Sequence, residues 1–182
     1  HITKGFTALF IDGSDTCILL ETIGYEKRGI EKPENETAVQ GAHEAFVEDL
    51  YTNISLIRRL IKNNNLMVET MTVGAESNLQ CAIIYLDGII NPEIPKEIKK
   101  RISKVKSEVI FTSGMLEQYI EDNKWSLFPQ IIQTERPDRA VSSIIEGKAL
   151  VILEGSPLAS AMPITFFHLF HTSEDNNLRW YY

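Results

Sequence analysis

Apolar and polar positions alternate at the start of the chain in a way that predicts a β-hairpin. Residues 6–11 and 17–20 form two short apolar runs, and residues 12–15 (Asp-Gly-Ser-Asp) separate them. An Asp-Gly pair between two such runs is typical of a hairpin turn. Residues 24–35 are polar and charged, with Gly29 and Pro33, which indicates a surface connection.

A long amphipathic helix is predicted between residues 43 and 62. The apolar positions recur every three or four residues, at Phe46, Leu50, Ile54, Ile57 and Ile61. The helix should end at the three asparagines of residues 63–65, because Asn favours turns over helix interiors. We expect a domain boundary at this point.

Strand and helix patterns alternate from residue 67 onward. Strands are expected at residues 67–73, 80–86, 109–112, 130–133, 149–153 and 158–164. Helices are expected after Asn91-Pro92, after Ser113 as N-cap, and after residue 134 with Pro137 in the first turn and Gly147 as C-cap. The inward face of the last helix should carry Ala140, Val141, Ile144 and Ile145. This order predicts a layered α/β (α+β) fold.

Composition and charge narrow the class of protein. The 182 residues are 43% hydrophobic and 24% charged, as in an ordinary globular protein. The formal net charge of -7 argues against a nucleic-acid partner, since phosphate binding draws on clustered Lys and Arg. No apolar stretch reaches the roughly 18 residues that a membrane helix needs, and no signal peptide opens the chain. Both ends look cut, so we expect a fragment of a longer protein.

The two cysteines, Cys17 and Cys81, each lie in an apolar run that predicts a strand. Thiols in such settings are usually buried small hydrophobic side chains, which favours an intracellular protein. The alternative is a single disulfide in an oxidising compartment.

Motifs for catalysis, cofactors and metals are absent from the sequence. There is no phosphate-binding glycine loop, no G-x-S-x-G, no H-E-x-x-H and no cysteine pairing typical of zinc. We therefore expect no catalytic centre, no cofactor and no metal.

Two histidine-containing strings leave alternatives open. His168 and His171 lie three apart, as metal ligands on one helix face would, but the phenylalanines and leucine around them favour a mostly buried amphipathic end. His43-Glu44 is explained by a carboxylate at a helix start, although a hydrolase or transferase using this pair is the alternative.

Two charged strings also allow two interpretations each. Arg136, in residues 135–138 (Glu-Arg-Pro-Asp), is predicted to pair with Glu44 or another acid and to anchor a helix start. Its guanidinium would also suit a carboxylate or phosphate ligand. The lysine-rich face of residues 96–104 is expected to be solvated, or else to lie against an acidic membrane surface.

Several strings together resemble the A subunits of bacterial spore germination receptors, the GerA family. Residues 28–36 resemble the family's R-x-I-x-E-P-x-x-E, residues 40–48 its R-G-P-R-E-G-F-x-E, and residues 53–59 its N-x-x-L-I-R-R-R. Residues 128–130, 134–138, 146–148 and 154–157 resemble F-P-Q, T-E-R-P-D, L-x-E-G-R and D-G-x-P.

The sequence departs from the family pattern where the family is most basic. Gln40, Ala42, His43 and Ala45 replace Arg, Pro, Arg and Gly, and residues 73–78 replace a basic I-G-R-R-T-K stretch. Residues 175–177 (Asp-Asn-Asn) replace an aromatic D-Y-Y.

The resemblance implies a fold of two small mixed α/β subdomains, similar to periplasmic-type substrate-binding lobes, the first truncated at its N-terminus. Residues 1–64 would then be the remainder of the first subdomain plus a linking helix, residues 65–172 the second subdomain, and residues 173–182 a tail toward an absent transmembrane region.

In function, the resemblance implies a non-enzymatic sensory or signal-coupling domain of a nutrient germinant receptor. The domain would lie on the cytoplasmic side of the spore inner membrane and work with B and C subunits. The alternative is a module that holds an amino acid or sugar germinant between its lobes. A polar network that fixes the subdomains to each other is expected from eight residues: Arg28, Glu44, Asn53, Arg58, Arg59, Glu135, Arg136 and Asp138.

Overall fold

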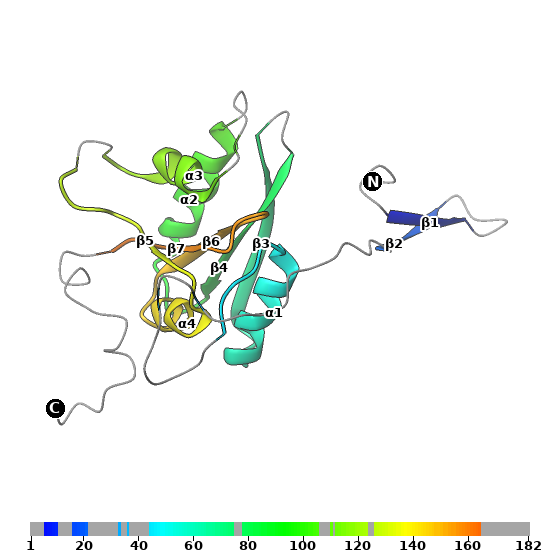
Figure 1. The fold of residues 1–182 in the computed structure, drawn as a ribbon, viewed down its shortest axis with the longest axis horizontal. Coiled ribbons are helices and arrows are strands. Elements are labelled where there is room, and N and C mark those ends of the chain that lie inside the picture. Colours follow the sequence, from blue (N-terminus) through cyan, green and yellow to red (C-terminus); the bar gives the residue numbers. More distant parts are fainter. Residues whose placement is uncertain are drawn as a thin grey trace.

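A five-stranded antiparallel sheet forms the centre of the protein (Figure 1). The computed structural model describes residues 6–10, 16–21, 33, 36, 44–74, 78–105, 110, 112–123 and 126–164. The strand order is β3-β4-β6-β7-β5. The strands are β3 (Leu66–Val73), β4 (Leu79–Leu86), β5 (Ile132–Thr134), β6 (Ala149–Leu153) and β7 (Ala159–Met162).

Two helices cover each face of this sheet. Helices α1 (Leu50–Leu60) and α4 (Pro137–Ile145) pack on one face, and α2 (Glu93–Lys104) and α3 (Ser113–Ile120) on the other (Figure 1). Successive residues of a strand point to opposite faces, so Ala82 and Ile84 enter the first core while Cys81 and Ile83 enter the second. All five residues of β6 are consequently buried. The predicted mixed α/β fold is confirmed.

The N-terminal hairpin is also confirmed. β1 (Phe6–Phe10) and β2 (Cys17–Glu21) pair antiparallel, with Phe10 opposite Cys17, and form a separate two-stranded sheet. The two cysteines are both free, but only Cys81 is buried as predicted. Burial raises the pKa of the Cys81 thiol to about 12. The prediction for Cys17 is wrong, because its side chain is exposed.

Helix α1 begins at Leu50, later than the predicted start at residue 43. Asp49 is its N-cap, and the carboxylate Oδ1 accepts a hydrogen bond of 2.7 Å from the Thr52 amide. The described residues before it, 44–49, are not helical, and the Phe46 amide donates to the Glu135 carbonyl at 2.8 Å. Pairing with a distant segment therefore overrides the helical spacing of Phe46.

The remaining elements follow the predictions with local differences. The N-cap of α3 is Thr112 instead of Ser113, since the Thr112 hydroxyl accepts from the Met115 amide. Ile145 is 56% exposed instead of facing inward. Gly147 ends α4 with a φ of +86°, as the left-handed cap predicts. In the strand expected at residues 109–112, neither Ile110 nor Thr112 is part of a strand.

Helix α1, which the sequence assigns to the first unit, shares a core with the sheet that follows it. Ile54 and Ile57 pack in one cluster with Ile84 of β4 and Ile144 of α4. The division at residue 64 stays a prediction. Residues 165–182, which include His168 and His171, lie outside the described part of the chain.

Candidate functional site

A polar site with three bonds to one side chain surrounds the carboxylate of Glu36. Its Oε2 accepts a hydrogen bond of 2.5 Å from the Thr134 hydroxyl and one of 3.2 Å from the Glu135 amide. Its Oε1 forms an ion pair with Arg139. The Glu36 and Arg139 side chains are only 17% and 18% exposed. Glu36, which follows the polar connection of residues 24–35, is thus bound to the start of α4 by two neutral donors and one cation.

The end of β5 and the first turn of α4 position these donors. Thr134 is the last residue of β5, and its buried hydroxyl also accepts from the Arg136 amide at 3.1 Å. Pro137 then occupies the first helical turn, where its missing amide hydrogen is not needed. The positive end of the α4 dipole adds to the attraction for a carboxylate.

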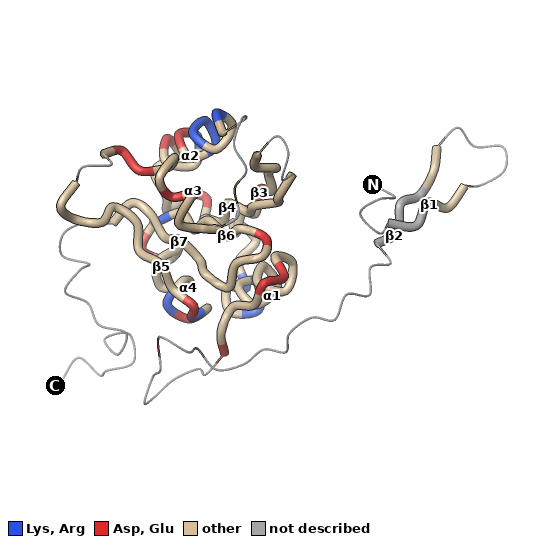
Figure 2. The backbone as a smooth tube through the Cα atoms, turned by 45° about the horizontal axis from the view of Figure 1, so that its top comes forward, with Lys and Arg blue, Asp and Glu red and all other residues tan. Residues whose placement is uncertain are grey.

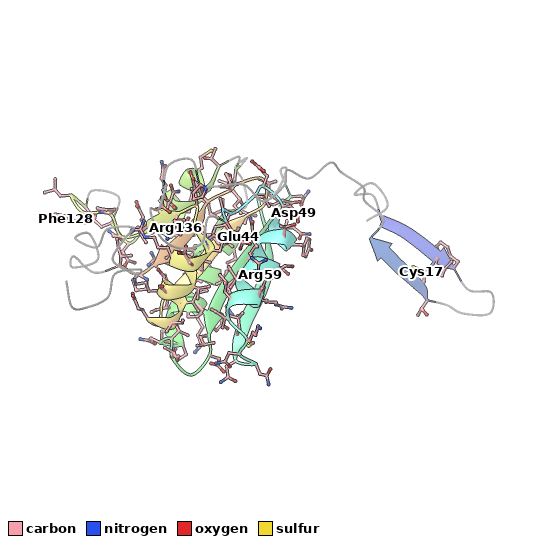
Figure 3. The ribbon with its side chains drawn as sticks, turned by 60° about the horizontal axis from the view of Figure 1, so that its bottom comes forward. Cys17, Glu44, Asp49, Arg59, Phe128 and Arg136 are labelled. Atoms are coloured by element: carbon pink, nitrogen blue, oxygen red, sulfur yellow. The ribbon has the colours of Figure 1, made fainter. Side chains whose placement is uncertain are left out.

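Arg136 lies at the same junction and is fully buried. Its Nε and one terminal nitrogen donate to the two oxygens of Asp138 at 3.1 and 2.6 Å, which makes the pair bidentate. Figure 3 shows Arg136 inside the body of the domain, close to α4. A guanidinium in this position depends on its partner, because an unpaired buried charge is strongly unfavourable.

A second set of contacts holds the segment that precedes α1, residues 44–49. The buried side chain of Asn53 bonds both backbone groups of Val47. Its Nδ2 donates to the Val47 carbonyl at 2.5 Å, and its Oδ1 accepts from the Val47 amide at 2.8 Å. The Gly155 amide donates to the Glu48 carbonyl at 2.9 Å. Together with the Phe46–Glu135 bond, these contacts fix residues 46–48 against the sheet and α4.

Glu44 and Arg59 form an ion pair at the edge of this junction (Figure 3). Their side chains are 40% and 51% exposed, so water screens the attraction. Glu44 precedes α1 and does not open a helix, which corrects the structural explanation of His43-Glu44. His43 itself lies outside the described residues.

The predicted network is therefore brought together in part. Arg136 pairs with Asp138 at the start of α4, next to Glu135, whose carbonyl accepts from the Phe46 amide. Asn53 bonds the neighbouring Val47, and Glu44 pairs with Arg59. Arg58 is exposed and lines a separate surface pocket with Lys62 and Asn63. The predicted member Arg28 lies outside the described residues.

Sequence reasoning missed Glu36, Thr134 and Arg139 as members of the site. A signal existed, because Glu36 closes one family-like string and Thr134 opens another. Nothing in a single sequence joins two strings that lie 98 residues apart, as these do.

The lysine-rich helix α2 is neutralised by nearby acids. Lys96 pairs with Glu93 at 2.8 Å, Lys100 with Glu97 at 3.0 Å and Lys99 with Glu69 at 2.9 Å. Figure 2 shows basic and acidic positions close together along α2. The Tyr85 hydroxyl also donates to Glu69, and this bond, with Lys99, lowers the pKa of the Glu69 carboxyl. These ion pairs with nearby acids, which are partly or largely exposed to solvent, explain the lysine-rich face of α2.

The described ranges hold neither a cluster of metal ligands nor a membrane span. Among these residues, no three His, Cys, Asp or Glu side chains cluster as metal ligands would. None of the helices described has the length and apolar character to cross a bilayer.

Comparison with known proteins decides the family. The family model described as "Bacillus/Clostridium GerA spore germination protein" matches residues 1–182. The chain belongs to the GerA family. Spore germination protein KA of Bacillus subtilis is 39% identical over 96% of the chain and 32% of that relative. Spore germination protein GerLA of Bacillus cereus is 36% identical over 98% of the chain and 36% of that relative.

A solved GerA-family structure has the same fold. The N-terminal domain of the A subunit of the Bacillus megaterium spore germinant receptor GerK3 is 36% identical, with a TM-score of 0.54. The match covers 67% of this chain and 97% of that one. The chain spans about a third of the length of the curated GerA relatives named above. The resemblance to germination receptor A subunits is thereby confirmed.

Proposed function

We propose that this chain is a non-enzymatic signal-coupling domain of a nutrient germinant receptor A subunit. In this role it works with B and C subunits at the inner spore membrane, to which the longer protein is joined by its transmembrane region. It passes germinant-driven changes between the region before residue 44 and the rest of the receptor. Membership of the GerA family supports the assignment to a germinant receptor A subunit.

The observation that carries the proposal is the bonding of Glu36 to the start of α4. Two hydrogen bonds and the ion pair with Arg139 tie the connecting region to an element that packs on the sheet. Half-buried charged groups resist separation, because an unpaired partner would lose both its solvent and its counter-charge. A displacement of the connecting region is then transmitted to α4 instead of being absorbed locally.

The test is a Glu36→Gln substitution in the intact receptor in spores. Gln keeps the shape of Glu36 but removes the charge that pairs with Arg139, so coupling weakens while the core remains packed. We expect the germination rate to fall roughly fivefold or more, since charge-assisted bonds of about 1.5–3 kcal/mol are weakened, with receptor abundance within about twofold of wild type.

The matched control is Glu93→Gln, which breaks an exposed ion pair with Lys96 on α2. It should leave both the germination rate and the abundance unchanged. Normal germination by the Glu36→Gln receptor at normal abundance would contradict the coupling role. A loss of abundance alone would show that Glu36 serves folding, and would equally count against coupling.

A second candidate function is germinant binding near the start of α4. The observation that favours it is that the Thr134 hydroxyl, the Glu135 amide and Arg139 form a carboxylate-binding corner, which Glu36 occupies. An amino acid germinant would have to compete with that side chain. Calorimetry of the domain with amino acids and sugars distinguishes the two functions, because heat at millimolar ligand would favour binding and its absence would leave coupling.

A further inference from the structure

Strand β3 forms one edge of the central sheet, and its outer side has no partner strand among the described residues. β3 pairs with β4 through eight successive positions without a bulge, and it lies at the end of the strand order (Figure 1). The strand at the opposite edge, β5, has only three residues. An unpaired edge presents backbone donors and acceptors to another extended chain. β3 is therefore the edge that offers the longer surface for a further strand.

The pairing with β4 shows which backbone groups of β3 face outward. The Asp87 amide donates to the Asn65 carbonyl at 2.9 Å, so every second residue from Asn65 onward exchanges hydrogen bonds with β4. Val68, Thr70 and Thr72 lie between those positions, and their amides and carbonyls point away from β4. No described residue bonds these outward groups. Three alternate positions thus remain open for pairing.

β3 lacks the features that usually keep edge strands from pairing. Its sequence, Leu-Met-Val-Glu-Thr-Met-Thr-Val, contains no proline, lysine or arginine. Glu69 is its single charged residue, and Lys99 of the same chain pairs with it at 2.9 Å. Thr70 and Thr72 are exposed, and threonine favours strands. The edge therefore suits an extended partner strand that carries little net charge.

The edge is complementary to itself. When two copies of β3 run antiparallel about a two-fold axis at Thr70, the two Thr70 residues exchange hydrogen bonds, and Val68 lies opposite Thr72 of the other copy. This register places Glu69 opposite Met71, so no two like charges lie directly opposite each other. The two threonines at the axis form a favourable cross-strand pair. All three outward positions of both copies are used.

We propose that two copies of this chain associate through β3, so that their five-stranded sheets become one continuous sheet. The axis is perpendicular to the sheet, and the α1/α4 faces of the two copies therefore lie on the same side. Two short strands bury less than the roughly 1,200 Å² of a stable interface, so the association is weak and depends on concentration. It does not depend on the coupling role of Glu36.

Disulfide trapping in the purified chain tests the register. Cys17 is exposed, so every variant also carries Cys17→Ser, whereas the buried Cys81 is kept. In the dimer the Cα atoms of the two Thr70 residues lie roughly 5.5 Å apart, within the range of about 4.4–6.8 Å that a disulfide spans. Thr70→Cys should therefore give a covalent dimer under mild oxidation, measured by electrophoresis without reducing agent.

Thr72→Cys is the matched control, because Thr72 is also an exposed threonine of β3. Its two copies lie four residues apart along the paired strands, roughly 13 Å, which is too far for a disulfide. Thr70→Cys should crosslink at least roughly tenfold faster, since thiols held in a dimer meet at a high effective concentration. Equal rates would mean random collision and would overturn the proposal.

Charges at the axis provide an independent test by sedimentation at about 1 mM chain, where weak association is measurable. Wild type should associate, and Thr70→Lys and Thr70→Glu should each be monomeric because like charges then lie opposite each other. An equimolar mixture of the two variants should associate again. Ser55→Lys, at an exposed position of α1, should behave as wild type. A monomeric wild type, or a mixture that stays monomeric, would overturn pairing between copies and leave the edge to a strand of another protein.

Discussion

The two faces of the central sheet use polar residues in opposite ways. On the α1/α4 face, Asn53 and Arg136 are fully buried, and they bind a neighbouring backbone and a neighbouring carboxylate. On the α2/α3 face, Arg101 and its acidic partners lie at the margin of an open pocket. One face is closed by internal polar contacts, and the other carries a pocket with a mainly apolar lining.

This difference assigns different tasks to the two faces. Buried polar contacts specify one arrangement, because any other leaves a charge or an amide without a partner. Pairs in solvent contribute about 0–1 kcal/mol and tolerate rearrangement. The α1/α4 face should therefore be rigid and intolerant of substitution, as coupling through Glu36 requires, and the α2/α3 face should tolerate changes at its polar margin.

Arg136→Ala should produce the largest effect and tests the contrast most directly. It leaves the Asp138 carboxylate without its bidentate partner and removes a fully buried side chain. We expect a loss of about 3–5 kcal/mol in the free energy of unfolding, measured with urea, and lower receptor abundance in spores.

Arg101→Ala is the control for the α2/α3 face. Its side chain is 22% exposed and bonds two carboxylates, and its removal should cost clearly less than that of Arg136. Equal losses in the two variants, or an unchanged melting temperature for Arg136→Ala, would remove the distinction between the faces.

Asn53→Ala should have an intermediate effect. The substitution deprives both backbone groups of Val47 of their partner in a buried setting. A loss of about 1–3 kcal/mol is expected by chemical denaturation. Ser55→Ala is the matched control on the same helix, since Ser55 is exposed and bonds only the Tyr51 carbonyl. A stability of Asn53→Ala equal to that of the control would show that residues 44–49 are held by other contacts.

Elements with a strong local pattern could be predicted from the sequence. The apolar runs of β4 and β6 fixed both strands, and Pro137 and Gly147 marked the two ends of α4. Ile145 was misplaced because it follows Ile144 by about 100° around the helix, which is enough to reach solvent.

The candidate site depended on contacts that no local pattern contains. Phe46 continues the helical spacing of α1, yet its amide bonds Glu135, which lies 89 positions later. Glu36 likewise bonds Thr134 at the end of β5, 98 positions later. The pocket between α2 and α3 arises from the relative placement of helices, which composition and periodicity leave undetermined.

The smallest expected effect concerns the pH dependence of the α2/α3 face. Tyr85 and Lys99 bond Glu69 at 2.6 and 2.9 Å, and they lower the pKa of its carboxyl below the usual 4.5. Because this pKa is lower in the folded than in the unfolded state, the contribution is complete above the ordinary pKa and is lost as the pH falls through the folded value. The contribution should be about 0.2–1 kcal/mol, since the pair is partly solvated.

Glu69→Gln should remove that dependence, which urea denaturation between pH 3 and 6 measures. Wild type should lose its advantage over the variant as the pH falls, and exposed Thr70→Ala on the same strand should keep the wild-type profile.

The alkaline side gives an independent check, because Glu69 raises the pKa of Tyr85 to about 12 from its usual 10. Stability should therefore decline between about pH 10 and 12 in wild type, and less in Glu69→Gln. The stability of wild type and of Glu69→Gln could also show the same dependence on pH on both the acid and the alkaline side. The Glu69 contact would then contribute nothing to stability, and the α2/α3 face would depend on its polar groups even less than the comparison requires.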